Sequence, residues 1–375
     1  MDKNFTNQEK VTEEVIWQDA RQLALYGLVP SEPFGVRVPA EVAKKVNDGV
    51  ESYSVCTAGG RVRFSTDSPF VALKAQYASG SVPTVNNHCV SYGFDLYRDE
   101  AGVEVFTAAA RPVAGFDYQT GEYKMLTRNG GKKTCYTLNL PVFAGLKSLQ
   151  IGIEKGSVLE AGKAYRNQKP VVFYGSSITH GAAAGRPGNT YESFISQKYN
   201  LDYMNLGFAG SARGEQVMAE YIAGLDMGVF VCDYDYNAPT AEHLQKTHYA
   251  FYETIRKQQP DVPYIMISRP TFFMSPEVNS QRRQVILDSY EKAKAQGDQR
   301  VFFIDGERLF AGEFAESCTS DGIHPNDLGF YRMAQVIGPV VAEACKPNRP
   351  HLGWCPEANV PLQGRQGSTD EVVTA

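Results

Sequence analysis

Two neighbouring serines, Ser176 and Ser177, stand where a buried strand would end and could supply a nucleophile. They follow the apolar run PVVFYG within the segment FYGSSITHG, residues 173–181. A serine hydroxyl is a weak nucleophile at neutral pH unless a neighbouring base takes its proton. Turns of this kind are common, so the chemical meaning of the segment depends on whether the chain offers such a base.

A candidate base lies in the segment TSDGIHPND, residues 319–327. Asp321 and His324 are three residues apart, just before a proline and a helix start. Such a turn can hold the carboxylate against one ring nitrogen, while the other ring nitrogen takes a proton from a serine hydroxyl. Alone, the pair would more simply be a turn cap and a solvated histidine. A serine turn at the same edge of a sheet favours the catalytic interpretation.

Acyl transfer through a serine also needs hydrogen-bond donors for the oxyanion of the tetrahedral intermediate. Three are available in principle, namely the backbone N–H of Ser177, the backbone N–H of Gly210 and the side-chain amide of Asn237. The alternative is that Gly210 only forms a turn and Asn237 only caps the next helix. The occurrence of all three donors on successive strand ends favours an oxyanion hole.

The elements that must position these residues form a repeated strand–helix pattern after residue 165. This pattern implies parallel strands joined by crossover helices and a sheet covered on both faces. Ligands of such sheets bind at the carboxyl ends of the strands, where all of the candidate residues fall. The expected strands are 170–175, 201–207, 227–237, 262–268 and 300–305, and the expected helices are 189–200, 215–224, 240–258, 275–297 and 326–345.

The first 165 residues instead contain short segments in which apolar and polar residues alternate, separated by turn signals such as NGG and ASGS. Closely spaced runs of period two predict an antiparallel β-sandwich. We therefore divide the chain into a β-sandwich with an N-terminal extension (1–165), an α/β catalytic domain (166–350) and a polar C-terminal extension (351–375). The alternating segments are 53–58, 60–68, 70–77, 104–112, 136–143 and 149–154.

The composition is that of a globular protein and argues against several classes of function. The 375 residues are 43% hydrophobic and 21% charged, with a net charge of −5 and no basic patch, which disfavours nucleic-acid and membrane partners. Seven scattered cysteines without a Cys-x-x-Cys pair predict reduced thiols and no zinc site or other metal. The polar N-terminus lacks the features of a secretory signal, so we expect a cytoplasmic protein. A homo-oligomer stays open.

Residues 170–345 resemble the SGNH hydrolase superfamily, also called GDSL-type esterases. YGSSITHG is similar to the first family block, with Ser177 in the nucleophile position, and DGIHPN is similar to the fifth, with Asp321 and His324. NLGFAG and DYDYNA are similar to the second and third blocks, with Gly210 and Asn237 as oxyanion donors. The resemblance implies a three-layer α/β/α fold, Ser-His-Asp hydrolysis of acyl esters and no cofactor.

Two departures from the family pattern concern the site itself. The usual Gly-Asp-Ser is Gly175-Ser176-Ser177 here, so the turn must be braced without the usual aspartate. The third block has Asp235 where a glycine is usual, and this acid could bind a substrate hydroxyl or be a hydrogen-bonded structural acid. Arg186, which follows the nucleophile segment, could reach a polar group of the substrate or hold its own loop in place.

The N-terminal half resembles the β-sandwich that precedes some SGNH domains and is named for a Gly-x-Asp-Leu-Tyr motif, here Gly93, Asp95, Leu96 and Tyr97. From the residues alone, this motif is simply a strand with alternating faces. By analogy with two-domain carbohydrate esterases, we expect hydrolysis of short acyl esters, acetyl above all, on a small molecule or oligosaccharide. The alternatives are a lipid or aryl esterase, an acyltransferase with the same triad, and a non-catalytic glycan-binding protein.

The remaining histidines are not expected to act as the base. His180 lies three residues after Ser177 but has no accompanying carboxylate, and His88 is expected at the surface of the sandwich. His243 and His248 fall within a predicted helix and are expected to face solvent.

Overall fold

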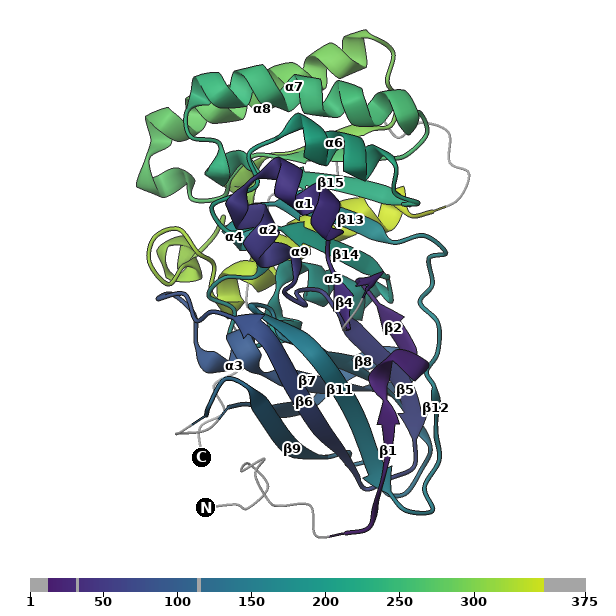
Figure 1. The fold of residues 1–375 in the computed structure, drawn as a ribbon. Helices are drawn as coiled ribbons and strands as arrows, with labels where there is room; N and C mark the ends of the chain where they lie inside the picture. The colour runs from purple at the N-terminus through teal and green to yellow at the C-terminus, as the bar shows by residue number, and fades with distance from the viewer. Residues whose placement is uncertain (1–12, 32–33, 113–115, 347–375) are drawn as a thin grey trace, which may run out of the picture.

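The N-terminal half is an antiparallel β-sandwich, as predicted. The computed structural model describes residues 13–31, 34–112 and 116–346 (Figure 1). One sheet has the strand order β1 (Val15–Asp19), β11 (Ala144–Glu154), β6 (Phe70–Gly80) and β9 (Thr120–Leu126). The other has the order β12 (Leu159–Ala161), β5 (Arg61–Thr66), β10 (Thr134–Asn139), β7 (Phe94–Glu100) and β8 (Val103–Ala110), with β2 (Ala24–Tyr26) also paired to β5.

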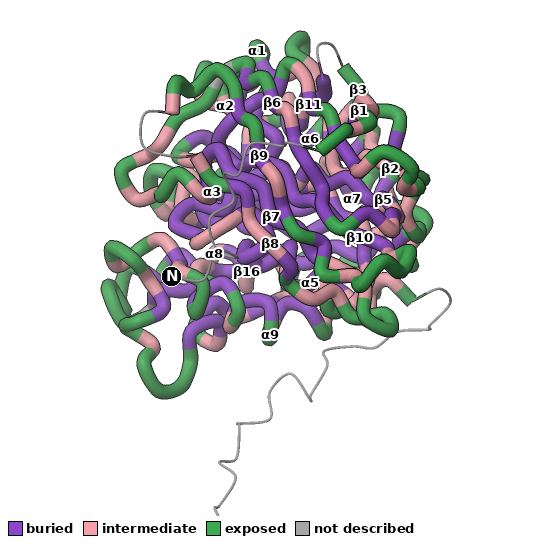
Figure 2. Tube along the Cα trace, turned by 90° about the horizontal axis from the view of Figure 1, so that it is seen from below, coloured by how far each residue is buried: buried purple, intermediate pink, exposed green. Residues whose placement is uncertain are grey.

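The sandwich forms because alternate residues of each strand point into one shared core. Phe64 of β5, Leu73 of β6 and Leu138 of β10 are fully buried in a single apolar cluster. Figure 2 shows this burial running along the strands, with the exposed residues gathered in the connections. A short ladder of β3 (Val29–Pro30) and β4 (Gly35–Val36) and the turn η2 (Ala20–Gln22) complete the strand region.

One alternating segment of the N-terminal half is not a strand. Residues 53–58 begin in the last turn of α2 (Asp48–Ser54), which forms a helix pair with α1 (Ala40–Val46). Among the described residues, α3 (His88–Tyr92) is the one further α-helix of this half. Asn47 caps α2 by accepting the Val50 N–H at 2.9 Å. Ala43 and Val50 belong to the apolar cluster of the C-terminal half, so burial against that half selected helix over strand here.

The C-terminal half contains a five-stranded parallel sheet, and each of its strands falls within a predicted range. The strand order is β14 (Tyr203–Gly207), β13 (Val171–Gly175), β15 (Val229–Asp233), β16 (Tyr264–Ile267) and β17 (Val301–Ile304). Between β13 and β15 the chain order of the strands reverses, which makes this the point where a doubly wound sheet opens a crevice for ligands.

Helices cover both faces of this sheet, so the expected three-layer α/β/α architecture is confirmed (Figure 1). Alternate strand residues separate the two faces. Tyr174 and Phe230 share one cluster with α6 (Gln216–Ala223), α7 (Ala241–Gln258) and α8 (Pro276–Ala295). Phe173 and Val231 share another with α5 (Tyr191–Tyr199) and α9 (Asp327–Ala344). Short 3-10 turns lie between these elements, namely η3 (Pro187–Asn189), η4 (Asp235–Asn237), η5 (Phe272–Met274), η6 (Gly306–Arg308) and η7 (Ala315–Cys318).

Local signals account for the start of α5, and burial corrects one expectation about α7. Thr190 caps α5 by accepting the Ser193 N–H at 3.3 Å. His243 is only partly exposed, and His248 is buried against Tyr234, with ring centroids 5.8 Å apart, so the prediction that His248 faces solvent was wrong. Burial lowers the pKa of His248 to about 4.

No helix in the described ranges has the length and apolar character that crossing a membrane requires. The proposed extension 351–375 lies outside the described residues.

Candidate active site

The nucleophile turn joins β13 to a single-turn helix, α4 (Ser177–His180). Ser176 caps α4, since its Oγ accepts the Ile178 N–H at 3.2 Å and its own N–H donates to the Asp233 carbonyl at 3.2 Å. Gly175 is required by close approach, because a Cβ there would lie 2.5 Å from the Asp233 carbonyl oxygen. Ser177 therefore stands at the carboxyl end of β13 with its hydroxyl free of the cap.

The Ser177 hydroxyl faces the histidine that the sequence singled out. Ser177 Oγ lies 2.9 Å from His324 Nε2, although the two residues are 147 positions apart in the chain. On the other side of the ring, His324 Nδ1 lies 2.7 Å from Asp321 Oδ2. The structure thus brings the three predicted residues into one hydrogen-bonded chain. With the hydrogen of the ring on Nδ1, Nε2 is the acceptor that a serine nucleophile requires of its base.

A compact turn before α9 holds Asp321 and His324 together. Asp321 Oδ1 accepts the backbone N–H groups of Ile323 and His324 at 3.0 and 2.8 Å, which fixes the carboxylate before it meets the ring. Partial burial acts to raise the pKa of Asp321, but hydrogen bonds from the backbone and ring of His324 outweigh it, so the net pKa is lowered. The Asp321 side chain is therefore an anion at neutral pH and an acceptor for the Nδ1 hydrogen.

Phe208 links the nucleophile turn to Asn237, one of the three predicted oxyanion donors. Phe208 donates its N–H to the Gly175 carbonyl at 2.9 Å and accepts an Asn237 Nδ2 hydrogen at 2.9 Å. This bond uses one of the two amide hydrogens of Asn237 and leaves the other for a ligand. Gly210 has a φ of +70°, a backbone conformation that favours glycine, and its N–H has no acceptor within the described part of the chain.

Two residues that the sequence did not single out brace the nucleophile turn in place of the missing aspartate. Thr179 Oγ1 donates to Asp233 Oδ2 at 3.2 Å, and both residues are buried. Burial, together with the neighbouring Asp235 carboxylate, raises the pKa of Asp233 well above its ordinary value. Asp233 ends β15, so its position in the sheet, more than any local motif, could have indicated this contact.

A second supporting pair, His180 and Arg37, lies behind the oxyanion turn. His180 Nδ1 accepts the Ala209 N–H at 3.4 Å, which leaves Nε2 as the donor to the Val142 carbonyl at 3.1 Å. Arg37 is fully buried and donates to the carbonyls of Tyr53 and Gly207 at 2.7 and 2.5 Å. Burial first, and the Arg37 charge second, lower the pKa of His180 well below its ordinary value. The ring is therefore neutral and structural.

Asp235 and Arg186 do not occupy positions that favour the predicted substrate contacts. Asp235 is buried, its Oδ1 accepting Arg282 Nε at 2.6 Å and its Oδ2 accepting the Arg269 N–H at 3.1 Å. These bonds favour the alternative that Asp235 is a structural acid. Arg186 lies 3.2 Å from Asp95 Oδ2 and donates to the Tyr97 hydroxyl at 3.2 Å, so its guanidinium holds its own loop against the sandwich.

The described residues contain no group of three or more His, Cys, Asp or Glu side chains that could hold a metal ion. Each acid near the turn already has a partner in the chain, as Asp233, Asp235 and Asp321 show.

Comparisons with known proteins identify a family for each half of the chain. Residues 168–342 match the GDSL-like lipase/acylhydrolase family, and residues 15–159 match the GxDLY domain, the N-terminus of SGNH-hydrolase-type esterases. A GDSL-like lipase structure from Bacteroides ovatus ATCC 8483 is 26% identical with a TM-score of 0.80, over 88% of this chain and 98% of that one. A search of the curated proteins returns no match.

Two more distant structures share the fold. A salicylyl-acyltransferase from a tetracycline biosynthetic pathway is 20% identical with a TM-score of 0.70, over 90% of this chain and 98% of that one. An acetyl xylan esterase from the rumen bacterium Butyrivibrio proteoclasticus is 12% identical with a TM-score of 0.55, over 88% and 98%. With both halves matched in order and the triad geometry in place, the chain belongs to the GDSL-like (SGNH) esterase family, in its two-domain form with an N-terminal GxDLY β-sandwich.

Proposed function

We propose that this protein is a serine esterase that removes short acyl groups, acetyl above all, from a carbohydrate or a related small molecule. The observation that carries the proposal is the chain of contacts from Ser177 Oγ to His324 Nε2 at 2.9 Å and from His324 Nδ1 to Asp321 Oδ2 at 2.7 Å. It lies at the carboxyl ends of parallel strands, the usual ligand edge of such sheets. Structural relatives that act on carbohydrate esters support the substrate class by analogy.

The proposed reaction has two halves. His324 takes the proton of Ser177 as the Oγ attacks the ester carbonyl, and Asp321 stabilises the imidazolium that forms. The N–H groups of Ser177 and Gly210 and the free amide hydrogen of Asn237 donate hydrogen bonds to the developing oxyanion. His324 then gives its proton to the leaving alcohol, and a water molecule, activated by the same imidazole, releases the acid from the acyl-enzyme.

Hydrolysis of p-nitrophenyl acetate, followed by acetate release from a panel of acetylated oligosaccharides, tests this proposal. Ser177→Ala is expected to lower kcat by at least about 10³-fold. The matched control is Ser176→Ala, which removes only the α4 cap and should retain activity at a cost of about 1 kcal/mol in stability. Equal rates for wild type and Ser177→Ala would overturn the assignment, as would loss of activity in a folded Ser176→Ala variant.

A second candidate, acyl transfer to an apolar acceptor or hydrolysis of an aryl or lipid ester, is favoured by side chains beside the Asp321–His324 turn. Ile323 is 44% exposed and Met274 is 56% exposed. Met274 lies against the turn, since its Cε is 3.0 Å from where a Cβ on Gly322 would stand. Long-chain and aryl esters, assayed with added alcohols, would reveal this activity as a kcat/KM that rises with chain length or as a transfer product.

A further inference from the structure

The loop formed by residues 182–189 runs from α4 to α5 and contacts both the nucleophile turn and α9, the helix that follows the proposed base. At its start, Ala182 donates its N–H to the Ser177 carbonyl at 2.9 Å. In its middle, Gly185 donates its N–H to Asp327 Oδ1 at 2.6 Å, and Asp327 begins α9 three residues after His324. The loop therefore contacts Ser177 itself and the first residue of the helix that follows His324.

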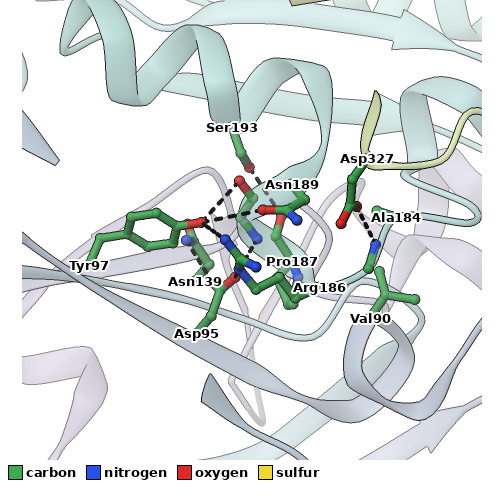
Figure 3. Close-up of polar contacts among 12 residues, drawn as sticks. Val90, Asp95, Tyr97, Asn139, Ala184, Arg186, Pro187, Asn189, Ser193 and Asp327 are labelled. Atoms are coloured by element: carbon green, nitrogen blue, oxygen red, sulfur yellow. Dashed lines mark hydrogen bonds and ion pairs between the residues drawn. The ribbon is translucent and has the colours of Figure 1, made fainter. Parts of the chain in front are cut away.

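The far end of this loop is held by a buried carboxylate of the β-sandwich (Figure 3). Asp95, in the Gly-x-Asp-Leu-Tyr strand β7, is fully buried. Its Oδ2 accepts the Gly188 N–H at 2.8 Å and lies 3.2 Å from Arg186 Nε. Its Oδ1 accepts Asn139 Nδ2 at 2.8 Å, so both carboxylate oxygens have donors and the buried charge has a cationic partner.

Tyr97, the last residue of the same motif, completes the contact. Its hydroxyl accepts a hydrogen from Arg186 Nη2 at 3.2 Å and donates to the Gly188 carbonyl at 3.4 Å. The fit is close, because a Cβ on Gly188 would lie 2.5 Å from the Tyr97 ring and 2.8 Å from Asp95 Oδ2. Arg186 also lies over the Phe106 ring, 4.1 Å from its centroid. The motif thus presents its polar side chains to one loop of the catalytic half.

We propose that Asp95 is a positioning residue for the esterase reaction, which acts through Gly188 and Arg186 to fix the loop 182–189 and thereby the spacing of Ser177 and His324. This inference rests on the proposed function for its effect on turnover, but not for its effect on the loop. Asp95 touches no reacting atom. Its carboxylate is suited to the task because Oδ2 accepts from the loop and places a negative charge beside the Arg186 guanidinium, and an asparagine would remove that charge.

The test compares Asp95→Asn, Arg186→Met and Arg186→Lys with a matched control, Asp99→Asn. Asp99 lies on the same strand and pairs with Lys163 at 2.6 Å, away from the loop. Amide hydrogen exchange of 182–189 is the readout that does not depend on activity, and kcat and KM for p-nitrophenyl acetate are the readouts that do. Arg186 is less buried than Asp95, so its variants keep the test available if Asp95→Asn does not fold.

For Asp95→Asn and Arg186→Met we expect faster amide hydrogen exchange in 182–189 and unchanged exchange in β13 and β15. In both variants kcat should fall by about 10- to 100-fold, with KM little changed. Arg186→Lys keeps the charge beside Asp95 and should recover part of the loss, while Asp99→Asn should match wild type. Unchanged exchange and kcat in both loop variants would overturn the proposal. So would a raised KM at unchanged kcat for Arg186→Met, which would instead indicate a substrate contact.

Failure of the proposed function has a different signature. In that case wild type releases no acid from any ester and Ser177→Ala equals wild type. The exchange comparison still decides whether Asp95 fixes the loop, because faster exchange supports the contact chain and unchanged exchange refutes it.

Discussion

Substitution of Asp321 by asparagine separates the two tasks of this carboxylate. An asparagine preserves the turn before α9 if its oxygen replaces Oδ1, which accepts the N–H groups of Ile323 and His324. Its NH₂ group then faces His324 Nδ1, which must become an acceptor. The ring hydrogen moves to Nε2, the nitrogen 2.9 Å from Ser177 Oγ, and a protonated Nε2 cannot take the serine proton.

The size of the fall in kcat follows from the free energy needed to restore the reactive tautomer, in which the hydrogen is on His324 Nδ1. The amide would have to flip, which breaks two hydrogen bonds to backbone N–H groups at about 1–2 kcal/mol each, or ~30- to ~1000-fold in the reactive population. Loss of the charge beside the imidazolium adds about tenfold, a modest factor because the Asp321 side chain is 39% exposed. We expect kcat to fall by roughly 3 × 10² to 10⁴, with KM little changed.

The assay is steady-state hydrolysis of p-nitrophenyl acetate, with thermal unfolding measured in parallel. Asp117→Asn is the matched control, because Asp117 Oδ1 accepts the N–H groups of Gln119 and Thr120 at 2.9 and 3.0 Å in the same pattern, without a histidine partner among the described residues. It should leave kcat within about twofold of wild type. A folded Asp321→Asn variant with kcat within about tenfold of wild type would refute the tautomer argument.

Three further predictions concern the base, the oxyanion frame and stability. His324→Ala should lower kcat by at least about 10³-fold in the same assay, and a smaller loss would contradict its role as base. Asn237→Ala should lower kcat by about 10²- to 10³-fold with KM little changed, and an unchanged kcat would remove Asn237 from the oxyanion hole. Because the pKa of buried His248 is about 4 in the folded protein, folding stability should fall as pH drops from 6.5 toward 4, by about 3 kcal/mol from this residue. The free energy of unfolding of His248→Phe, measured in urea, should lack that part of the pH dependence. The same pH dependence in the variant and in wild type would contradict the prediction.

The sheet and the Ser-His-Asp cluster could be predicted from the sequence because their signals are local. Each parallel strand is a short apolar run, and the Asp321–His324 contact is set within one turn. The doubly wound order then brings Ser177 and His324 to the same sheet edge, as the rule for carboxyl ends of parallel strands predicts.

The supporting contacts could not be predicted, because they depend on residues far apart in the chain. Arg37 reaches the Gly207 carbonyl across 170 positions, and no local pattern marks it. The sequence left open whether Asp235 binds a substrate hydroxyl or is a structural acid, because its partner Arg282 lies 47 positions away in α8. The α2 helix was missed for a related reason, since an alternating run at its end imitates a strand and only packing on the C-terminal half selects the helix.

The division of the chain near residue 165 is based on the change from alternating segments to strand–helix repeats. One apolar cluster nevertheless contains buried residues from both sides of it. Val142 and Phe143 of the N-terminal half lie in the same buried cluster as Ile178 and Tyr191 of the C-terminal half. Phe143 also stacks on the His180 ring, with centroids 4.0 Å apart, in the helix that begins with Ser177. A nucleophile turn that uses the sandwich as part of its own packing cannot be formed by the catalytic half alone without exposing that surface to water. The N-terminal half is therefore part of the packing that supports the nucleophile turn.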